Sequence, residues 1–306
     1  MATAELKKQR GRPSNFDHDE ALEKALHVFW KRGYEGASMT ELTKVLGINR
    51  PSIYAAFGIG EAVAKYLVAN GAKVAIVDMQ QDRIDRVVAE IRGTGGEAIG
   101  IRADVTSEAD TARFVAETVH TFGHLNIAVT CAGIIRDGTM LTLDRETGTV
   151  SKKLGLDKWK PVIDVNLTGS FLTLRDAAEA MVNGGWEGLL VPISSVNKVG
   201  QLGQLNYSSA KVAIDLWPKV MVGEFLLRGI RNIRVVGIAP GYTETGLLAQ
   251  MNQEALKAIL QDVHLGRLVH PEEIADMIGY CVKNAALNAA TIEITGGLCY
   301  PKGIAK

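Results

Sequence analysis

The sequence has 306 residues, of which 47% are hydrophobic and 22% charged, and its formal net charge is zero. A chain of this length and composition can bury a large core, which excludes an intrinsically disordered protein. It holds no apolar run of about twenty residues and no signal-peptide core near its start, so we expect a cytoplasmic protein. The three cysteines and six histidines lack the spacing of a disulfide framework or a metal site. We therefore expect reduced, buried thiols and no metal.

The first part of the chain, residues 1–57, combines a basic arm with three short predicted helices. Amphipathic spacing predicts a helix over Asp17–Lys31, and Ser38 and Asn49 are suited to cap a second and a third helix. Gly47 separates those two helices, which is the arrangement of a helix-turn-helix. The zero net charge thus conceals a basic end.

The run GRPSNFDHDEALEKALHVFWKRGYEGASMTELTKVLGINRPSIYAAFG resembles the DNA-binding head of the tetracycline-repressor (TetR) family of transcription regulators. The resemblance implies that the third helix enters the major groove and that the arm contacts phosphates or the minor groove. The residues that it assigns to DNA are Arg10, Arg12, Lys44, Asn49, Arg50, Ser52 and Tyr54. DNA is therefore one candidate partner.

The second part, residues 58–306, alternates short apolar runs with helix-length segments. The runs cover residues 72–78, 98–104, 125–133, 189–194, 233–241 and 290–297. This alternation predicts parallel strands covered by helices on both faces, which is a doubly wound, Rossmann-like α/β fold.

A dinucleotide site is predicted at the start of this second part. Gly58-Ile59-Gly60 precedes a helical run, Glu61–Asn70, whose N-terminus is suited to bind a pyrophosphate. Asp78 ends the next strand about twenty residues on, where a carboxylate accepts hydrogen bonds from the ribose hydroxyls and repels a 2′-phosphate. The pattern therefore favours NAD over NADP.

Later landmarks resemble the short-chain dehydrogenase/reductase family. Asp104-Val105 is similar to its adenine-contacting pair, and Thr130-Cys131-Ala132-Gly133 is similar to its Asn-Asn-Ala-Gly motif. The run from Pro240 to Thr245 is similar to its loop beside the nicotinamide. The cofactor-binding residues that the resemblance implies are Gly58, Ile59, Gly60, Asp78, Asp104, Val105, Cys131, Ala132, Gly133, Tyr207, Lys211, Pro240, Gly241, Thr243 and Thr245.

Tyr207 and Lys211 have the Tyr-x-x-x-Lys spacing that places both side chains on one face of a helix. We expect the lysine ammonium to lower the tyrosine pKa, so that Tyr207 transfers the proton between alcohol and ketone. The resemblance adds Ser195, with Ser194 as the alternative, for the substrate oxygen, and Asn166 for a water-linked proton path.

The chain departs from the family where the cofactor loop begins. The family's Thr-Gly-x-x-x-Gly-x-Gly corresponds to residues 53–60, where Tyr54 replaces the first glycine. The segment before it contains Pro51, which is unsuited to a central strand. The family's first strand is therefore missing, which predicts weaker cofactor binding and a fusion of two genes at this point.

Three functions remain open from the sequence. The first is an NAD-dependent oxidoreductase that interconverts a secondary alcohol and a ketone, for which 3-oxoacyl thioesters are one substrate class, and which forms a homodimer or homotetramer. The second is a DNA-binding regulator with a dehydrogenase-like sensor or dimerisation domain, and the third is an inactive fusion. The long segment Leu141–Lys160 is either a substrate lid or a surface loop.

Overall fold

The computed structural model describes residues 58–244 and 253–299. The chain divides into two units, Met1–Ala55 and Ala56–Lys306, and every described residue belongs to the second. The expected helix-turn-helix and all of its DNA-facing residues lie outside the described residues, so they stay predictions.

Six parallel strands correspond to the six apolar runs of the sequence. They are β1 (Val74–Asp78), β2 (Ala98–Arg102), β3 (Ile127–Thr130), β6 (Gly188–Pro192), β7 (Ile233–Pro240) and β8 (Ala290–Ile294). Every pair of neighbours among them is parallel. The predicted parallel α/β fold is confirmed, and its apolar strands require helices on both faces.

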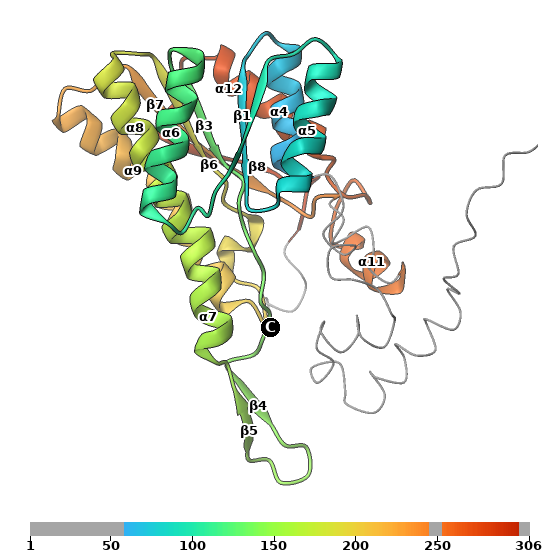
Figure 1. The fold of residues 1–306 in the computed structure, drawn as a ribbon. Helices are drawn as coiled ribbons and strands as arrows, with labels where there is room; N and C mark the ends of the chain where they lie inside the picture. Colours follow the sequence, from blue (N-terminus) through green and yellow to red (C-terminus); the bar gives the residue numbers. More distant parts are fainter. Residues whose placement is uncertain (1–57, 245–252, 300–306) are drawn as a thin grey trace, which may run out of the picture. The chain divides into compact units, whose positions relative to one another are not determined.

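The helices form two layers around these strands (Figure 1). On one side lie α4 (Ile59–Ala69), α5 (Gln81–Gly93) and α12 (Pro271–Lys283). On the other lie α6 (Glu108–Phe122), α8 (Ser170–Gly184) and α9 (Leu205–Leu227). Shorter helices are α7 (Leu156–Val162), the π-helix η1 (Ile163–Gly169), the 3-10 helix η2 (Val196–Val199) and α11 (Gln253–Leu260). None of the helices in this part of the chain is long and apolar enough to cross a membrane.

Local sequence signals fix where α6 begins and ends. The Ser107 hydroxyl accepts a hydrogen bond from the backbone N–H of Asp110 at 3.2 Å, as in an N-cap. Gly123 ends the helix with φ 84°, a left-handed conformation that glycine adopts without steric cost. This orientation carries the chain from the end of β2 back to the start of β3.

The six strands form two separate sheets. One contains β1 and β2, and the other has the order β3-β6-β7-β8. Within residues 58–244 and 253–299, no strand pairs with the second edge of β1 or with the outer edge of β3. The residues before Gly58 lie outside the described part of the chain, so the loss of the family's first strand stays a prediction.

Helix α4 joins the two sheets through its apolar face. Ala62 and Val63 belong to the core cluster that includes β6, β7 and α12. Ala64 belongs to a second cluster with Val74 of β1, and Leu67 packs against both clusters. The two sheets therefore share one helix layer even though their strands are not paired.

The segment Leu141–Lys160 contains an antiparallel hairpin, β4 (Leu141–Leu143) and β5 (Val150–Lys153), followed by the start of α7. Figure 1 shows this hairpin projecting away from the helix layers. Every residue of both strands except Thr142 is exposed. Of the two alternatives, a surface element describes this segment better than a lid.

The cysteines differ in their surroundings. Cys281 is buried in the core, Cys131 is half-buried, and Cys299 is exposed. The prediction of buried thiols is wrong for Cys299, which follows β8 and is exposed.

Candidate active site

The carboxyl ends of β1 and β2 form the first part of the site. Asp78 ends β1, and its Oδ1 accepts a hydrogen bond from the backbone N–H of Gln80 at 2.9 Å. Asp104 follows β2, and its Oδ1 accepts hydrogen bonds from the backbone N–H and the hydroxyl of Thr106. These bonds fix both carboxylates at the sheet edge, where a ligand of a doubly wound fold binds.

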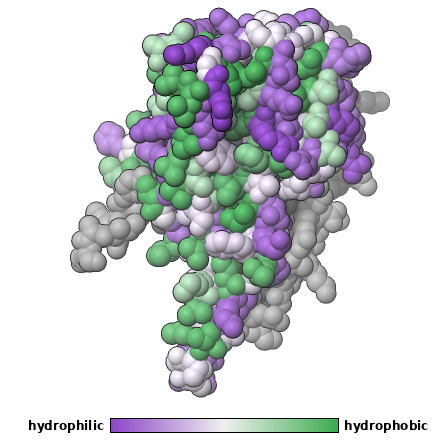
Figure 2. All heavy atoms as spheres, turned by 90° about the vertical axis from the view of Figure 1, so that its left-hand side faces the viewer, coloured by the Kyte–Doolittle hydropathy of each residue, from purple (hydrophilic) through white to green (hydrophobic). Residues whose placement is uncertain are grey.

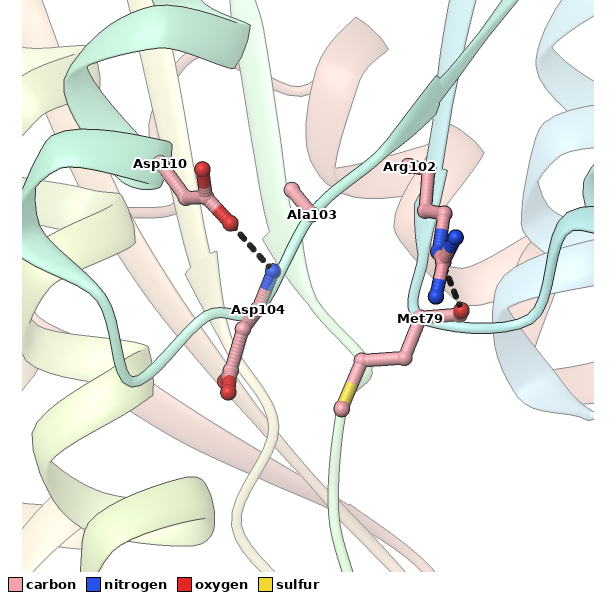
Figure 3. A pocket seen from close by; sticks show the side chains of 5 residues that line it. All are labelled: Met79, Arg102, Ala103, Asp104 and Asp110. Atoms are coloured by element: carbon pink, nitrogen blue, oxygen red, sulfur yellow. Dashed lines mark hydrogen bonds between the residues drawn. The ribbon is translucent and has the colours of Figure 1, made fainter.

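A cavity of about 240 Å³ lies beside these strand ends, lined by Met79, Arg102, Ala103, Asp104 and Asp110. Figure 3 shows the Asp104 backbone N–H directed at the Asp110 carboxylate, which accepts it at 2.8 Å. The Arg102 guanidinium donates to the Met79 carbonyl oxygen at 3.2 Å. The cavity is open and partly polar, which suits an adenosine group.

The glycine segment lies at the N-terminus of α4. Gly58 is the N-cap residue, in an extended conformation and without a side-chain cap. A Cβ on Gly60 would lie 3.1 Å from the Cβ of Cys131, so a larger residue here would press on the Cys131 side chain. Ile59 packs its side chain against the core, so only its backbone can contact a ligand. The helix N-terminus suits a pyrophosphate.

The loop after β3 is held by Asn166. Its Oδ1 accepts the Ile134 backbone N–H at 2.7 Å, and its Nδ2 donates to the Ile134 carbonyl at 2.8 Å. A Cβ on Gly133 would lie 3.0 Å from Asn166 Oδ1, and Ala132 is exposed. Val105 packs against Gly169, at the end of the same π-helix. In this structure both polar atoms of the asparagine side chain are bonded to Ile134, so the asparagine positions the loop.

Ser195, Tyr207 and Lys211 lie together. The Tyr207 and Ser195 side chains lie close enough to interact, and this interaction partly offsets the rise in the pKa of Tyr207 that burial causes. The Lys211 Nζ lies 5.5 Å from the centroid of the Tyr207 ring and donates to the Ile193 carbonyl at 2.8 Å. Ser194 instead donates its hydroxyl to the Lys211 carbonyl at 2.8 Å. Of the two candidate serines, Ser195 is the one that faces the tyrosine.

The pKa values of this group differ from the sequence expectation. Burial raises the pKa of Tyr207, and the negative charge of Asp137 raises it further. Burial also lowers the pKa of Lys211, to about 8, so its positive charge is weakened. The expected lowering of the tyrosine pKa by the lysine is not found, because burial of the Tyr207 hydroxyl is the largest influence on that pKa and raises it. At neutral pH, Tyr207 is therefore a proton donor.

The sequence analysis missed a polar chain that leads from Ser195 to the surface. The Ser195 hydroxyl accepts the backbone N–H of Asn197 at 3.1 Å, and the Asn197 side-chain amide donates to Gln204 Oε1 at 2.9 Å. The Gln204 side chain lies near the Asp137 carboxyl. Partial burial raises the pKa of Asp137, and the nearby Lys158 ammonium opposes that rise. No sequence motif links these residues, since Asp137 follows β3 while Ser195, Asn197 and Gln204 lie in the connection between β6 and α9.

The last part of the site follows β7. A Cβ on Gly241 would lie 2.8 Å from the backbone of Thr295, so glycine is required here. Thr243 is buried, and its hydroxyl donates to the Gly241 carbonyl at 3.0 Å. Pro240 ends the strand, and Thr245 lies outside the described residues. Among the described residues, no cluster of metal-ligating side chains is found.

Comparison with known proteins agrees with this geometry. The family model of the short chain dehydrogenases matches residues 53–256, and that of the bacterial regulatory proteins of the tetR family matches residues 21–63. The chain therefore belongs to the short-chain dehydrogenase family and carries a TetR-like helix-turn-helix region at its N-terminal end. The two matches share residues 53–63.

Individual relatives cover most of the second part of the chain. A 3-oxoacyl-[acyl-carrier-protein] reductase of Synechocystis sp. is 33% identical over 246 residues, which is 79% of this chain and 92% of that protein. The human (3R)-3-hydroxyacyl-CoA dehydrogenase is 32% identical over 253 residues, or 79% and 91% of the two chains. A solved short-chain dehydrogenase/reductase from Serratia marcescens aligns with a TM-score of 0.69 at 28% identity, covering 79% and 93%. These relatives support the general function of an oxidoreductase of this family.

Proposed function

We propose that the chain is an NAD(H)-dependent oxidoreductase that interconverts a secondary alcohol and a ketone, with 3-oxoacyl thioesters as the first substrate class to test. The observation that carries this proposal is the contact of Tyr207 with Ser195 beside Lys211. The substrate class rests on the names of the Synechocystis and human relatives.

The described residues fit a nicotinamide dinucleotide. The Asp78 carboxylate, at the end of β1, would accept hydrogen bonds from the adenosine ribose. Asp104 and Val105 would contact the adenine, and the segment from Gly58 to Gly60 would contact the pyrophosphate. Further residues proposed to contact the cofactor are Ile59, Cys131, Ala132, Gly133, Tyr207, Lys211, Pro240, Gly241, Thr243 and Thr245. When bound, NADH supplies the hydride to the carbonyl carbon.

Side chains of this protein donate and replace the proton that the reaction consumes. The Ser195 hydroxyl orients the substrate oxygen and stabilises the charge that develops on it. Tyr207, protonated because burial raises its pKa, gives its hydroxyl proton to that oxygen as the C–O double bond becomes a single bond. Lys211, whose pKa is about 8, can return a proton toward the tyrosine. Asn166 acts by holding the Ile134 loop in place.

The test is a titration of the purified full-length protein with NADH, followed by turnover of acetoacetyl-CoA. The Tyr207→Phe variant is the matched control, because it keeps the ring and removes only the proton donor. We expect it to bind NADH as the parent does and to lose about 10²- to 10⁴-fold in kcat. Failure of the parent to bind NADH at about millimolar concentration, a free energy near −4 kcal/mol, would overturn the enzyme proposal.

The preference for NADH over NADPH is tested with Asp78→Ser. The Asp78 carboxylate would repel a 2′-phosphate, so its removal should improve NADPH binding relative to NADH by at least about tenfold. Equal effects on both cofactors would show that Asp78 does not face the ribose.

Apolar side chains gather on the face that carries α8 and α9 (Figure 2). Phe171 and Val182 on α8 and Leu216 and Leu227 on α9 are exposed there. Such a face favours a homodimer or homotetramer, and light scattering of the purified protein tests it.

A second candidate function is DNA binding by the TetR-like region, which the family match over residues 21–63 favours. Its candidate contacts are Arg10, Arg12, Lys44, Asn49, Arg50, Ser52 and Tyr54. In this role the dehydrogenase part would act as a sensor or dimerisation domain. Selection of bound sequences from a random DNA library tests it, and a protein that enriches no sequence at low salt would exclude a regulator.

A further inference from the structure

Strands β1 and β3 are exposed in the way that edge strands are. All five residues of β6 are buried, whereas only Val74 of β1 and Thr130 of β3 are buried. The outermost strands, β2 and β8, are also incompletely buried. Yet among the residues that the structure describes, β1 and β3 each pair with a strand on one side only, and both lie between the two helix layers (Figure 1). We call the space between their unpaired edges the β1–β3 slot.

Apolar side chains cover both faces of the β1–β3 slot. On one face, α4 packs Ala64 against the β1 sheet and Val63 against the core of the β3 sheet. On the other face, a cluster that contains Ala75 and Val77 of β1 also includes Leu125, which precedes β3. A strand placed here would be buried on both sides.

The hydrogen-bond pattern between β1 and β2 shows which backbone groups of β1 face the slot. The Val74 N–H donates to the Glu97 carbonyl at 3.1 Å, and the Asp78 carbonyl accepts the Ala103 N–H at 3.0 Å. Since successive residues of a parallel strand bond to opposite sides, Ala75 and Val77 direct their N–H and C=O groups away from β2.

The same reasoning applies to β3. The Asn126 carbonyl accepts the Leu189 N–H at 2.7 Å, so Ile127 and Val129 direct their backbone groups away from β6. Unpaired backbone groups at such an edge favour the addition of another strand.

We propose that the β1–β3 slot is an acceptor site for one extended apolar segment supplied by another polypeptide. Because β1 and β3 belong to parallel sheets, the segment must run parallel to both. The apolar cover on both faces requires uncharged, β-branched residues along about five positions, the common length of a strand. Proline is excluded, since the segment must donate hydrogen bonds on both sides.

A second cavity marks the amino end of the slot. It measures about 250 Å³ and is lined by Tyr66, Leu67, Asn70, Ala72, Ile127, Gly279, Val282 and Lys283. These residues come from the end of α4, the start of β3 and the end of α12. A segment parallel to β3 would begin here, where the Lys283 ammonium disfavours a charged amino terminus.

The chemistry of this chain's own preceding residues argues for an external segment. A parallel strand in the slot would end at the carboxyl edge, where Gly58 leads into α4. The residues at the corresponding sequence positions are Asn49, Arg50, Pro51 and Ser52, which lie outside the described part. A charged arginine and a proline are unsuited to a strand buried on both faces.

The test uses the full-length protein and a synthetic peptide, acetyl-Lys-Val-Ala-Ile-Val-Thr-Gly-amide. Its matched control has proline in place of the central isoleucine. At about a hundredfold excess over its Kd, we expect the first peptide to raise Tm by about 5 °C or more, in a saturable way. It should also slow hydrogen exchange over residues 74–78 and 127–130, while the proline peptide has neither effect.

The proposed function and this inference can fail separately. Slower exchange over both strands without NADH turnover would support the acceptor site and contradict the enzyme. A different result would overturn the acceptor site: the protein alone turns over NADH, and its hydrogen exchange over both strands is already slow and unchanged by the peptide. In that case the chain fills the slot itself. Equal effects of the two peptides would also overturn it.

Discussion

Asn166 provides the sharpest test of how the site is held together. Its side chain is fully buried and satisfies both the N–H and the C=O of Ile134, at 2.7 and 2.8 Å. The Asn166→Ala variant removes both partners and leaves two backbone groups unpaired. Each unpaired buried group costs about 1–3 kcal/mol, so we expect a loss of about 2–5 kcal/mol once water replaces part of the contact. For a domain of this size that lowers Tm by about 5–15 °C.

Thermal and urea unfolding, followed by circular dichroism, measure this effect. The control is Asn70→Ala, which removes an exposed amide that donates to the Tyr66 carbonyl at 2.9 Å and should change stability by less than about 0.5 kcal/mol. If both variants unfold within about 2 °C of the parent, the Ile134 loop is not held by Asn166 and the reasoning is refuted. A fall in Tm confined to Asn166→Ala would support its positioning role.

Two further predictions concern pH and helix termination. In the Asp137→Asn variant, the alkaline limb of the kcat/KM profile for ketone reduction should move to lower pH. The reason is that the Asp137 charge raises the pKa of Tyr207 and that reduction uses the protonated phenol. The control, Asp144→Asn on the hairpin, should leave the limb unmoved, and an unmoved limb in Asp137→Asn would contradict the reasoning. In Arg234→Met, the guanidinium that donates to four backbone carbonyls at the end of α12 and just beyond it is lost. We expect unfolding free energy to fall by about 2–4 kcal/mol in urea titrations, against little change for the exposed Arg231→Met, and equal losses would argue against that role.

The sequence determined the elements because their signals are local. Each apolar run became a strand, and the four-residue spacing of Tyr207 and Lys211 placed both on one side of α9. The proline and polar residues before Gly58 predicted the loss of a strand, and β1 and β3 remain in separate sheets in the described part of the chain. The DNA-facing residues stay predictions.

Only the tertiary structure decided how these elements meet. It distinguished Ser195 from Ser194, turned Asn166 toward Ile134, and brought Asp137 close enough to raise the pKa of Tyr207. Such contacts join residues far apart in the sequence, and their geometry depends on how helices and loops pack on the sheets. The spacing of residues along the chain determines which face of a helix or strand a side chain lies on. Which residue it contacts on a neighbouring element depends on how all the core side chains pack together.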